Sequence, residues 1–180
     1  LEAMDRILPN MDREICQNLT MILKKRGVEV YPSSMVSAVE KTEDGTLSVH
    51  YTNKGEEKAA QGEAVLCAIG RRPNTAGLFG EGFTVEMERG RILTDENFQT
   101  SVPGIYAVGD VAARIQLAHV ASAQGTVCVE KLAGKTSPAN LTLIPSCIYT
   151  SPEIACIGIT ADEAKAAGRA VKVGKFGMFA

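Results

Sequence analysis

A glycine and an acid, Gly109 and Asp110, are the residues whose types and positions best suit the binding of a ligand. They follow a short apolar run, residues 105–108, which predicts a buried strand of a parallel sheet. In open α/β sheets, ligands collect beyond the carboxyl ends of the strands. A glycine lets a ligand approach closely, and an aspartate carboxylate only accepts hydrogen bonds, which suits a cofactor with several hydroxyl groups. The spacing alone leaves open a plain Gly-Asp turn at the end of a strand.

The sequence predicts a helix just after this turn, over residues 117–132, which Gly134 ends. Its apolar residues recur at helical spacing, and the inward positions are Val120, Ala123, Val127 and Leu132. The first N–H groups of a helix have no acceptor within it, and the helix dipole is positive there, so this end favours negative charge. The first turn of this helix carries Ala118 and His119. We prefer a positioning role for His119, because no carboxylate partner for acid–base catalysis is evident.

The first part of the chain predicts a helix and a β-meander. Residues 12–26 form the helix, with Asp12 as its N-cap and an apolar stripe made of Ile15, Leu19, Ile22 and Leu23. Strands over residues 36–42 and 47–51 form a hairpin around an Asp-Gly turn, and a third strand follows Gly55.

Continuous apolar runs predict further strands. The clearest covers residues 64–69 and ends at Gly70. Shorter strands are expected at residues 28–30, 92–95, 98–100, 147–150 and 154–159, and a last one is expected to begin near Val171. Thr160 and Glu163 have the spacing of a capping box, which predicts a helix over residues 160–168. Together these patterns predict an α/β fold class.

Composition excludes several classes of protein. The 180 residues carry a formal net charge of −2, so no basic surface for nucleic acid is indicated. The apolar runs are far shorter than the ~20 residues that a membrane span needs. The five cysteines show no CxxC spacing, and we expect reduced, buried thiols in an intracellular compartment. With two histidines in the chain, a zinc cluster is not expected.

Residues 100–110 followed by Leu117-Ala118-His119 resemble the second flavin-binding segment of the pyridine nucleotide–disulfide oxidoreductases. Residues 1–3, 68–74 and 149–154 agree with the same family, in the same order. Within the family, the resemblance is closest to members that oxidise the dihydrolipoyl group of 2-oxo acid dehydrogenase complexes. It implies FAD and NAD as cofactors, that lipoyl group as a partner, a homodimer, and a location in the cytoplasm or, in a eukaryote, the mitochondrial matrix.

The resemblance also implies roles for residues of the predicted FAD site. The carboxylate of Asp110 would accept a hydrogen bond from a ribityl hydroxyl of FAD, beside Gly109. The helix start at Leu117, Ala118 and His119 would point at the pyrimidine edge of the flavin ring, where reduction places negative charge. Gln116 stands where the family more often has Met, so its side-chain contact is an open point.

For NAD, the resemblance implies three contacts. Glu2 would accept hydrogen bonds from the adenosine ribose and repel a 2′-phosphate, which favours NAD over NADP. Val36 would lie against the adenine, and the backbone at Gly70 would approach the cofactor. An exposed terminal Glu2 and a core Val36 are the alternatives that the residues alone leave open.

The resemblance divides the chain into residues 1–77, the C-terminal part of a Rossmann-like NAD domain with its meander; residues 78–145, the second segment of the FAD domain; and residues 146–180, the start of an α+β dimerisation domain. We expect a piece of a longer protein that cannot turn over alone and holds no catalytic residue. The CxxxxC pair, the Gly-rich GxGxxG loops and a His followed five residues later by Glu do not occur in it. Mercuric reductase, coenzyme-A-disulfide reductase and a non-catalytic nucleotide-binding module remain as alternatives.

Overall fold

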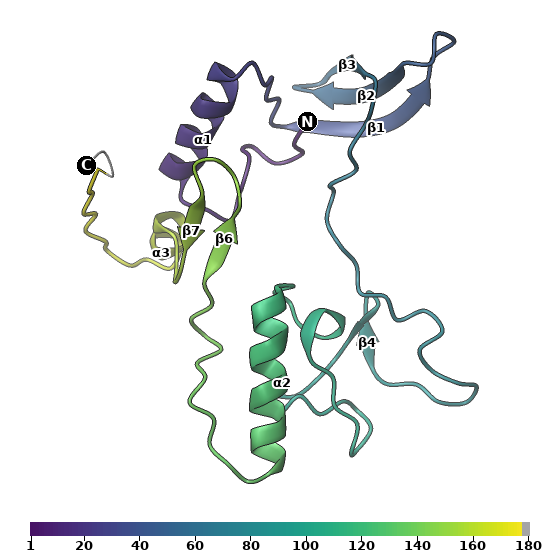
Figure 1. The fold of residues 1–180 in the computed structure, drawn as a ribbon, viewed down its shortest axis with the longest axis vertical. Helices are drawn as coiled ribbons and strands as arrows, with labels where there is room; N and C mark the ends of the chain where they lie inside the picture. Colours follow the sequence, from purple (N-terminus) through teal and green to yellow (C-terminus); the bar gives the residue numbers. More distant parts are fainter. Residues whose placement is uncertain (178–180) are drawn as a thin grey trace. The chain divides into compact units, whose positions relative to one another are not determined.

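A computed structural model describes residues 1–177 (Figure 1). The chain forms two compact units, one made of residues 1–67 together with residues from 145 onward, and the other of residues 68–144. Both units contain a helix, and the strands within the described residues form small antiparallel sheets. The mixed helix-and-strand class that the sequence predicts is therefore confirmed, whereas the parallel strand pairing expected within it is not observed among these residues.

The first helix, α1, covers Arg13–Lys25 with Asp12 at the N-cap position, as predicted. Gly27 follows it with a φ of +82°, a conformation that glycine adopts without strain and that commonly ends helices. Cys16 and Leu19 are its buried residues, whereas the predicted inward residue Ile15 is exposed. The described residues of this unit thus cover only part of the predicted apolar stripe of α1.

The predicted β-meander is confirmed. Strands β1 (Ser34–Lys41), β2 (Leu47–Asn53) and β3 (Glu56–Gly62) pair antiparallel in the order β1-β2-β3. The turn between β2 and β3 places Lys54 and Gly55 at φ values of +53° and +83°, the two positive values that suit a two-residue hairpin turn. The meander is therefore fixed by local turn chemistry.

Two predicted strands are wrong in this part of the chain. Residues 64–69 form no strand, and Leu66 and Ile69 are 88% and 94% exposed. Residues 28–30 also form no strand, and neither does the start of the chain. Glu2 nevertheless hydrogen-bonds through its backbone to Tyr31 and Ser34, at 3.0 and 2.8 Å. A buried parallel strand needs a hydrogen-bonded neighbour on each side, and the described residues supply none for residues 64–69.

The second unit contains the predicted helix, α2, over Ala118–Leu132. Val120 and Val127 are buried as predicted, whereas the predicted inward residue Leu132 is exposed. The unit also contains the two-residue strands β4 (Met87–Glu88) and β5 (Arg91–Ile92), and a 3₁₀ turn, η1, over Gly109–Val111. Of the strand predicted at residues 92–95, only Ile92 lies in a strand, β5. Of the strand predicted at residues 98–100, only Gln99 pairs, in a single bridge.

Residues 105–108 do not form a strand of a parallel sheet among the described residues, which corrects the prediction. The segment makes one isolated antiparallel bridge, between Gln99 and Tyr106. Its side chains still alternate between two apolar clusters: Ala107 belongs to one with Val85 and Ile92, while Tyr106 and Val108 pack on one formed by Phe98, Val127 and Cys128. Residues 106–108 thus pack on both faces, whereas Ile105 is exposed, and the described residues do not supply the neighbours that would make the run a sheet strand.

The segment after residue 145 forms a hairpin and a short helix. Strands β6 (Ser146–Ile148) and β7 (Ile154–Cys156) pair antiparallel and are shorter than predicted, and α3 covers Ala161–Ala166. The predicted capping box is confirmed, with the Glu163 N–H donating to Thr160 Oγ1 at 3.2 Å and the Thr160 N–H to Glu163 Oε2 at 2.7 Å. The strand predicted from Val171 is not formed in the described residues up to 177.

The cysteines differ from the prediction in their burial. All five are free, but only Cys16 and Cys128 are buried, and Cys67 and Cys147 are exposed. Cys67 is exposed because residues 64–69, predicted as a covered strand, lie open. Across residues 1–177, none of the helices has the length and apolar character that crossing a membrane requires.

Candidate functional site

The turn at Gly109 packs closely on helix α2. Gly109 is buried with a φ of +72°, and its N–H donates to the side-chain Oε1 of Gln124 at 2.8 Å. A Cβ atom built on Gly109 would come within 3.0 Å of the Ala121 Cβ, tighter than nine in ten real contacts of this kind. Both the positive φ and this close approach require glycine here. The turn is therefore fixed on the first half of α2 by one hydrogen bond and one tight contact.

Asp110 is presented outward by this turn. The N–H groups of Ala112 and Ala113 donate to the Gly109 carbonyl at 3.0 and 2.7 Å and shape the 3₁₀ turn. The Gln116 side-chain amide donates to the Asp110 backbone carbonyl at 3.2 Å. The Asp110 carboxylate itself is exposed and makes no hydrogen bond or ion pair to the residues that the structure describes. It is therefore an available acceptor held on a rigid backbone.

The start of α2 carries no side-chain cap. Leu117 is the N-cap residue in an extended conformation, and its carbonyl accepts the first helical hydrogen bond, from the Ala121 N–H at 3.0 Å. Ala118 and His119 follow in the first turn and are exposed. An N-terminus without a side-chain cap leaves positively polarised N–H groups at its first residues, so this end favours a partly negative group. The predicted site residues from Gly109 to His119 thus lie together in one unit around η1 and the start of α2.

The residues predicted to bind NAD are divided between the two units: Glu2 and Val36 belong to one, and Gly70 belongs to the other. The Glu2 carboxylate accepts a hydrogen bond from the Met4 N–H at 2.8 Å, through Oε1. Its backbone carbonyl accepts from the Ser34 N–H, so Glu2 lies beside the first residue of β1, two residues from the exposed Val36. Gly70 belongs to the other unit, has a φ of +111°, and has open space where a Cβ would be. Glu2 therefore contacts β1 two residues before Val36, and Gly70 is an open backbone position.

Gln124 is a site residue that the sequence analysis missed. Its side chain is half-buried and clamps Gly109, the residue that precedes the exposed carboxylate. A signal for it exists: Gln124 is four residues after Val120 and three before Val127, so it is a polar residue on the apolar stripe of α2. A buried polar side chain at such a position needs a partner, and here the partner is the turn.

Two hollows lie elsewhere in the unit that contains α1. One, of about 720 Å³, is lined by residues 12–15 and Asn18 at the α1 start, residues 159–162 and Ala164 around α3, and residues 171–176. The other, of about 450 Å³, is lined by residues 5–7, parts of α1, Val30 and Pro32. None of the predicted FAD or NAD residues lines either hollow.

Comparison with known proteins decides the family. The family model described as Pyridine nucleotide-disulphide oxidoreductase matches residues 1–125 of this chain. The chain belongs to this family. The model of the dimerisation domain of the same family matches residues 144–180.

Relatives and solved structures agree with this assignment. The dihydrolipoyl dehydrogenase of Bacillus subtilis (strain 168) is 42% identical over 183 residues, covering 100% of this chain and 38% of the relative. The crystal structure of LpdA from Mycobacterium tuberculosis aligns with a TM-score of 0.79 and 30% identity over 92% of this chain and 36% of its own. A mutant of the HOCl-induced flavoprotein disulfide reductase RclA from Escherichia coli, in a Cu(II) complex, aligns with a TM-score of 0.79 and 28% identity over 93% and 37% of the two chains. This chain thus spans well under half the length of the relatives it matches.

Proposed function

We propose that this chain is part of a dihydrolipoyl dehydrogenase, an FAD- and NAD-dependent enzyme that oxidises a dihydrolipoyl group to the cyclic disulfide and reduces NAD⁺ to NADH. The observation that carries the proposal is the 42% identity to a dihydrolipoyl dehydrogenase across the whole of this chain. The reaction balances, since the dithiol loses two electrons and two protons, NAD⁺ takes up a hydride, and one proton is released. The CxxxxC pair and the His–Glu dyad that such chemistry uses are not among these 180 residues.

The residues around η1 and the start of α2 fit FAD. FAD, when bound, supplies two-electron transfer between a dithiol and a nicotinamide. The exposed Asp110 carboxylate supplies an acceptor for a ribityl hydroxyl, and it has no partner among the described residues that a hydroxyl would have to displace. The uncapped α2 start at Ala118 supplies N–H groups and a positive dipole end for the negative charge of the reduced ring. Gly109 lets the backbone come close, and Gln124 and Gln116 hold the turn in place.

The residues proposed for NAD fit less directly. Glu2 keeps one carboxylate oxygen, Oε2, outside its hydrogen bond to Met4, so it retains an acceptor for a ribose hydroxyl. Val36 offers an exposed apolar side chain for an adenine ring. Gly70 offers an open backbone at a conformation that other residues rarely adopt. These three contacts, and the division at residues 77 and 145, belong to the proposal.

A second candidate is another flavoprotein disulfide reductase with a different substrate. The observation that favours it is the equal TM-score of 0.79 to LpdA and to RclA, the latter named as a flavoprotein disulfide reductase. Mercuric ion and coenzyme-A disulfide are the substrates that we would test under this reading. The higher identity to dihydrolipoyl dehydrogenase favours the first proposal.

The expected assembly follows from the same relatives. We propose a homodimer, because a dimerisation-domain model matches residues 144–180. We propose the lipoyl group of a 2-oxo acid dehydrogenase complex as the natural partner. The proposed compartment is the cytoplasm, or the matrix in a eukaryote, where the exposed thiols of Cys67 and Cys147 would stay reduced.

The test is a substrate comparison on the purified gene product at its natural length. We expect a yellow protein with a flavin absorption spectrum that reduces NAD⁺ with dihydrolipoamide, and that prefers NAD⁺ to NADP⁺. Turnover of mercuric ion or coenzyme-A disulfide with no dihydrolipoamide activity would favour the second candidate. A colourless protein without any of these activities would contradict both and favour a non-catalytic module.

A further inference from the structure

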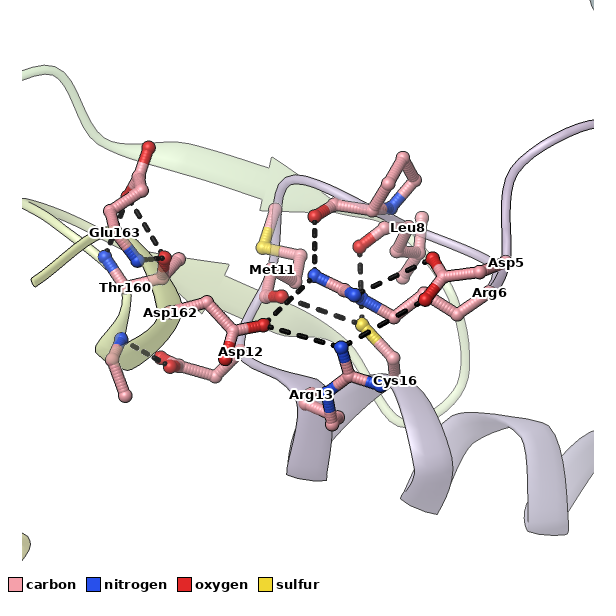
Figure 2. A network of polar contacts seen from close by, with 12 residues as sticks. Asp5, Arg6, Leu8, Met11, Asp12, Arg13, Cys16, Thr160, Asp162 and Glu163 are labelled. Carbon is pink, nitrogen blue, oxygen red and sulfur yellow. Dashed lines mark hydrogen bonds and ion pairs between the residues drawn. The ribbon is translucent and has the colours of Figure 1, made fainter. Parts of the chain in front are cut away.

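Polar contacts join the segment before α1 to the start of α3, about 150 residues later in the chain. Arg6 Nη2 donates to Asp162 Oδ2 at 3.2 Å, and Arg13 Nη2 lies 3.7 Å from the same oxygen. The Asp12 carboxylate accepts from the Ala161 N–H at 2.8 Å. Figure 2 shows these side chains converging between α1 and α3. We call Arg6, Asp12, Arg13 and Asp162 the latch.

Each guanidinium group of the latch lies between two carboxylates. Asp5 lies 3.5 Å from Arg6 and 3.8 Å from Arg13, so the two guanidinium groups are each shared between the carboxylates of Asp5 and Asp162. The Arg6 side chain is only 20% exposed, whereas the others are about half exposed. Charge-assisted hydrogen bonds strengthen as water is excluded, so the contact of Arg6 with Asp162 is the one expected to contribute most.

The N-terminal side of the latch is also held by contacts that do not involve α3. Arg6 Nη2 also donates to the Pro9 carbonyl at 3.1 Å. The buried Cys16 thiol donates to the carbonyls of Leu8 and Met11 at 3.1 and 3.6 Å, and Leu8 has a φ of +51°. A non-glycine residue at positive φ persists where its surroundings over-determine the backbone, as these contacts do. The turn is thus a preorganised receptor for α3.

The Asp12 side chain bonds to α3 and not to its own helix, α1. It occupies the N-cap position of α1, yet its side chain makes no capping hydrogen bond to that helix. Its Oδ1 instead accepts from the first N–H of α3, while Thr160 and Glu163 satisfy the neighbouring N–H groups through the capping box. The first N–H of α3, that of Ala161, is therefore paired by a residue of the turn before α1.

We propose that the latch holds the region matched by the dimerisation-domain model, residues 144–180, onto the start of the region matched by the first family model, and that Arg6 and Asp162 are its main positioning residues. The inference rests on family membership and on these contacts, and it does not depend on which disulfide the enzyme reduces. In this proposal, contacts from residues 1–67 hold the dimerisation segment of the same chain in position.

The test is hydrogen exchange on the purified gene product at its natural length. Arg6→Gln leaves α3 itself unaltered, so it isolates docking from helix stability. We expect about fivefold faster amide exchange over residues 154–167 in Arg6→Gln and in Asp162→Asn, with α2 unchanged. The double variant should exchange no faster than the faster single variant by more than about twofold, because the contact between Arg6 and Asp162 is already lost in each single variant.

Lys175→Gln is the matched control. Lys175 and Glu14 form an ion pair of 2.7 Å between the same two segments, but both side chains are more than half exposed. This variant should alter exchange over residues 154–167 by less than about twofold. Unchanged exchange in Arg6→Gln, or additive effects of Arg6→Gln and Asp162→Asn, would overturn the proposal.

A salt titration keeps the test informative if a variant does not fold. In the unaltered protein, raising the NaCl concentration from about 0.05 to about 1 M screens the latch charges. Exchange over residues 154–167 should then rise more than exchange over α2. An equal response of both segments would contradict the proposal.

Discussion

Gly109→Ala tests how the turn is held on α2. Two costs arise at this position. A residue with a Cβ at a φ of +72° costs about 1–2 kcal/mol relative to glycine. The new Cβ would also lie 3.0 Å from the Ala121 Cβ, and overpacking of this kind costs about 1–3 kcal/mol. The expected destabilisation of the turn is therefore about 3 kcal/mol.

The assay is native-state hydrogen exchange of the gene product at its natural length, read at the amides of residues 107–113. A loss of about 3 kcal/mol corresponds to about a hundredfold faster exchange through local opening. The hydrogen bond from the Gly109 N–H to Gln124 should be lost at the same time. Flavin retention should fall together with it, because Asp110 is displaced.

Gly134→Ala is the matched control for Gly109→Ala. Gly134 has a nearly identical φ of +70°, but a Cβ there would meet open space. Gly134→Ala therefore carries only the conformational cost of the positive φ, and amide exchange around residue 134 should become about tenfold faster. Ala121→Gly added to Gly109→Ala should recover part of the loss by removing the contact. Equal effects of Gly109→Ala and Gly134→Ala would refute the close-packing argument.

Four further predictions follow from the site and the caps. Asp110→Asn should weaken flavin binding about tenfold without altering stability, since the exposed carboxylate has no described partner; flavin titration of the apoprotein measures this. Glu2→Gln should narrow the preference for NAD⁺ over NADP⁺ in steady-state kinetics, and an unchanged ratio would count against its role. Hydrogen bonds from the Thr160 N–H and hydroxyl hold the pKa of the Glu163 carboxyl below its usual range. The ionised Glu163 side chain therefore stabilises α3 fully at pH values above the usual pKa of a glutamate, and this stabilisation is lost as the pH falls through the lowered pKa. Hydrogen exchange of α3 between about pH 5 and pH 3 checks this against Glu163→Gln, which should be insensitive. The 180 residues expressed alone should retain little FAD and show no turnover, and a stoichiometric flavin spectrum would contradict that.

Helices and hairpins could be predicted from the sequence because their signals are local. Gly27 marks the end of α1, Lys54-Gly55 fixes a two-residue turn, and Thr160 with Glu163 caps α3. Each of these depends on residues within one or two turns of the element. Their positions therefore follow from nearby sequence.

Strands predicted for a parallel sheet could not be placed in this way. Residues 64–69 and 105–108 have apolar runs typical of buried strands, but a strand forms only where hydrogen-bonding neighbours exist. Long-range partners explain the other omissions. Gln124 meets Gly109 through packing of the turn on α2, and Arg6 meets Asp162 across 156 positions of sequence. Neither pairing has a local signature.

The types of residue at the turn and helix start of the candidate site could be predicted from the sequence. A glycine followed by an exposed acid and an uncapped helix start are all present where the sequence places them. The clamp on that turn was not predictable without packing, because only the structure shows which side chain reaches the Gly109 N–H. The sequence therefore suggests the proposed ligand-facing residues, whereas Gln124, which holds the turn, is found only from the structure.

The most direct measurement is a crystal structure of the gene product at its natural length with its flavin bound. The account predicts an Asp110 carboxylate oxygen about 2.7 Å from a ribityl hydroxyl, with the backbone of Ala118 facing the pyrimidine edge of the ring. A flavin bound away from η1 and the α2 start, or an Asp110 carboxylate directed to solvent beside a bound flavin, would contradict it.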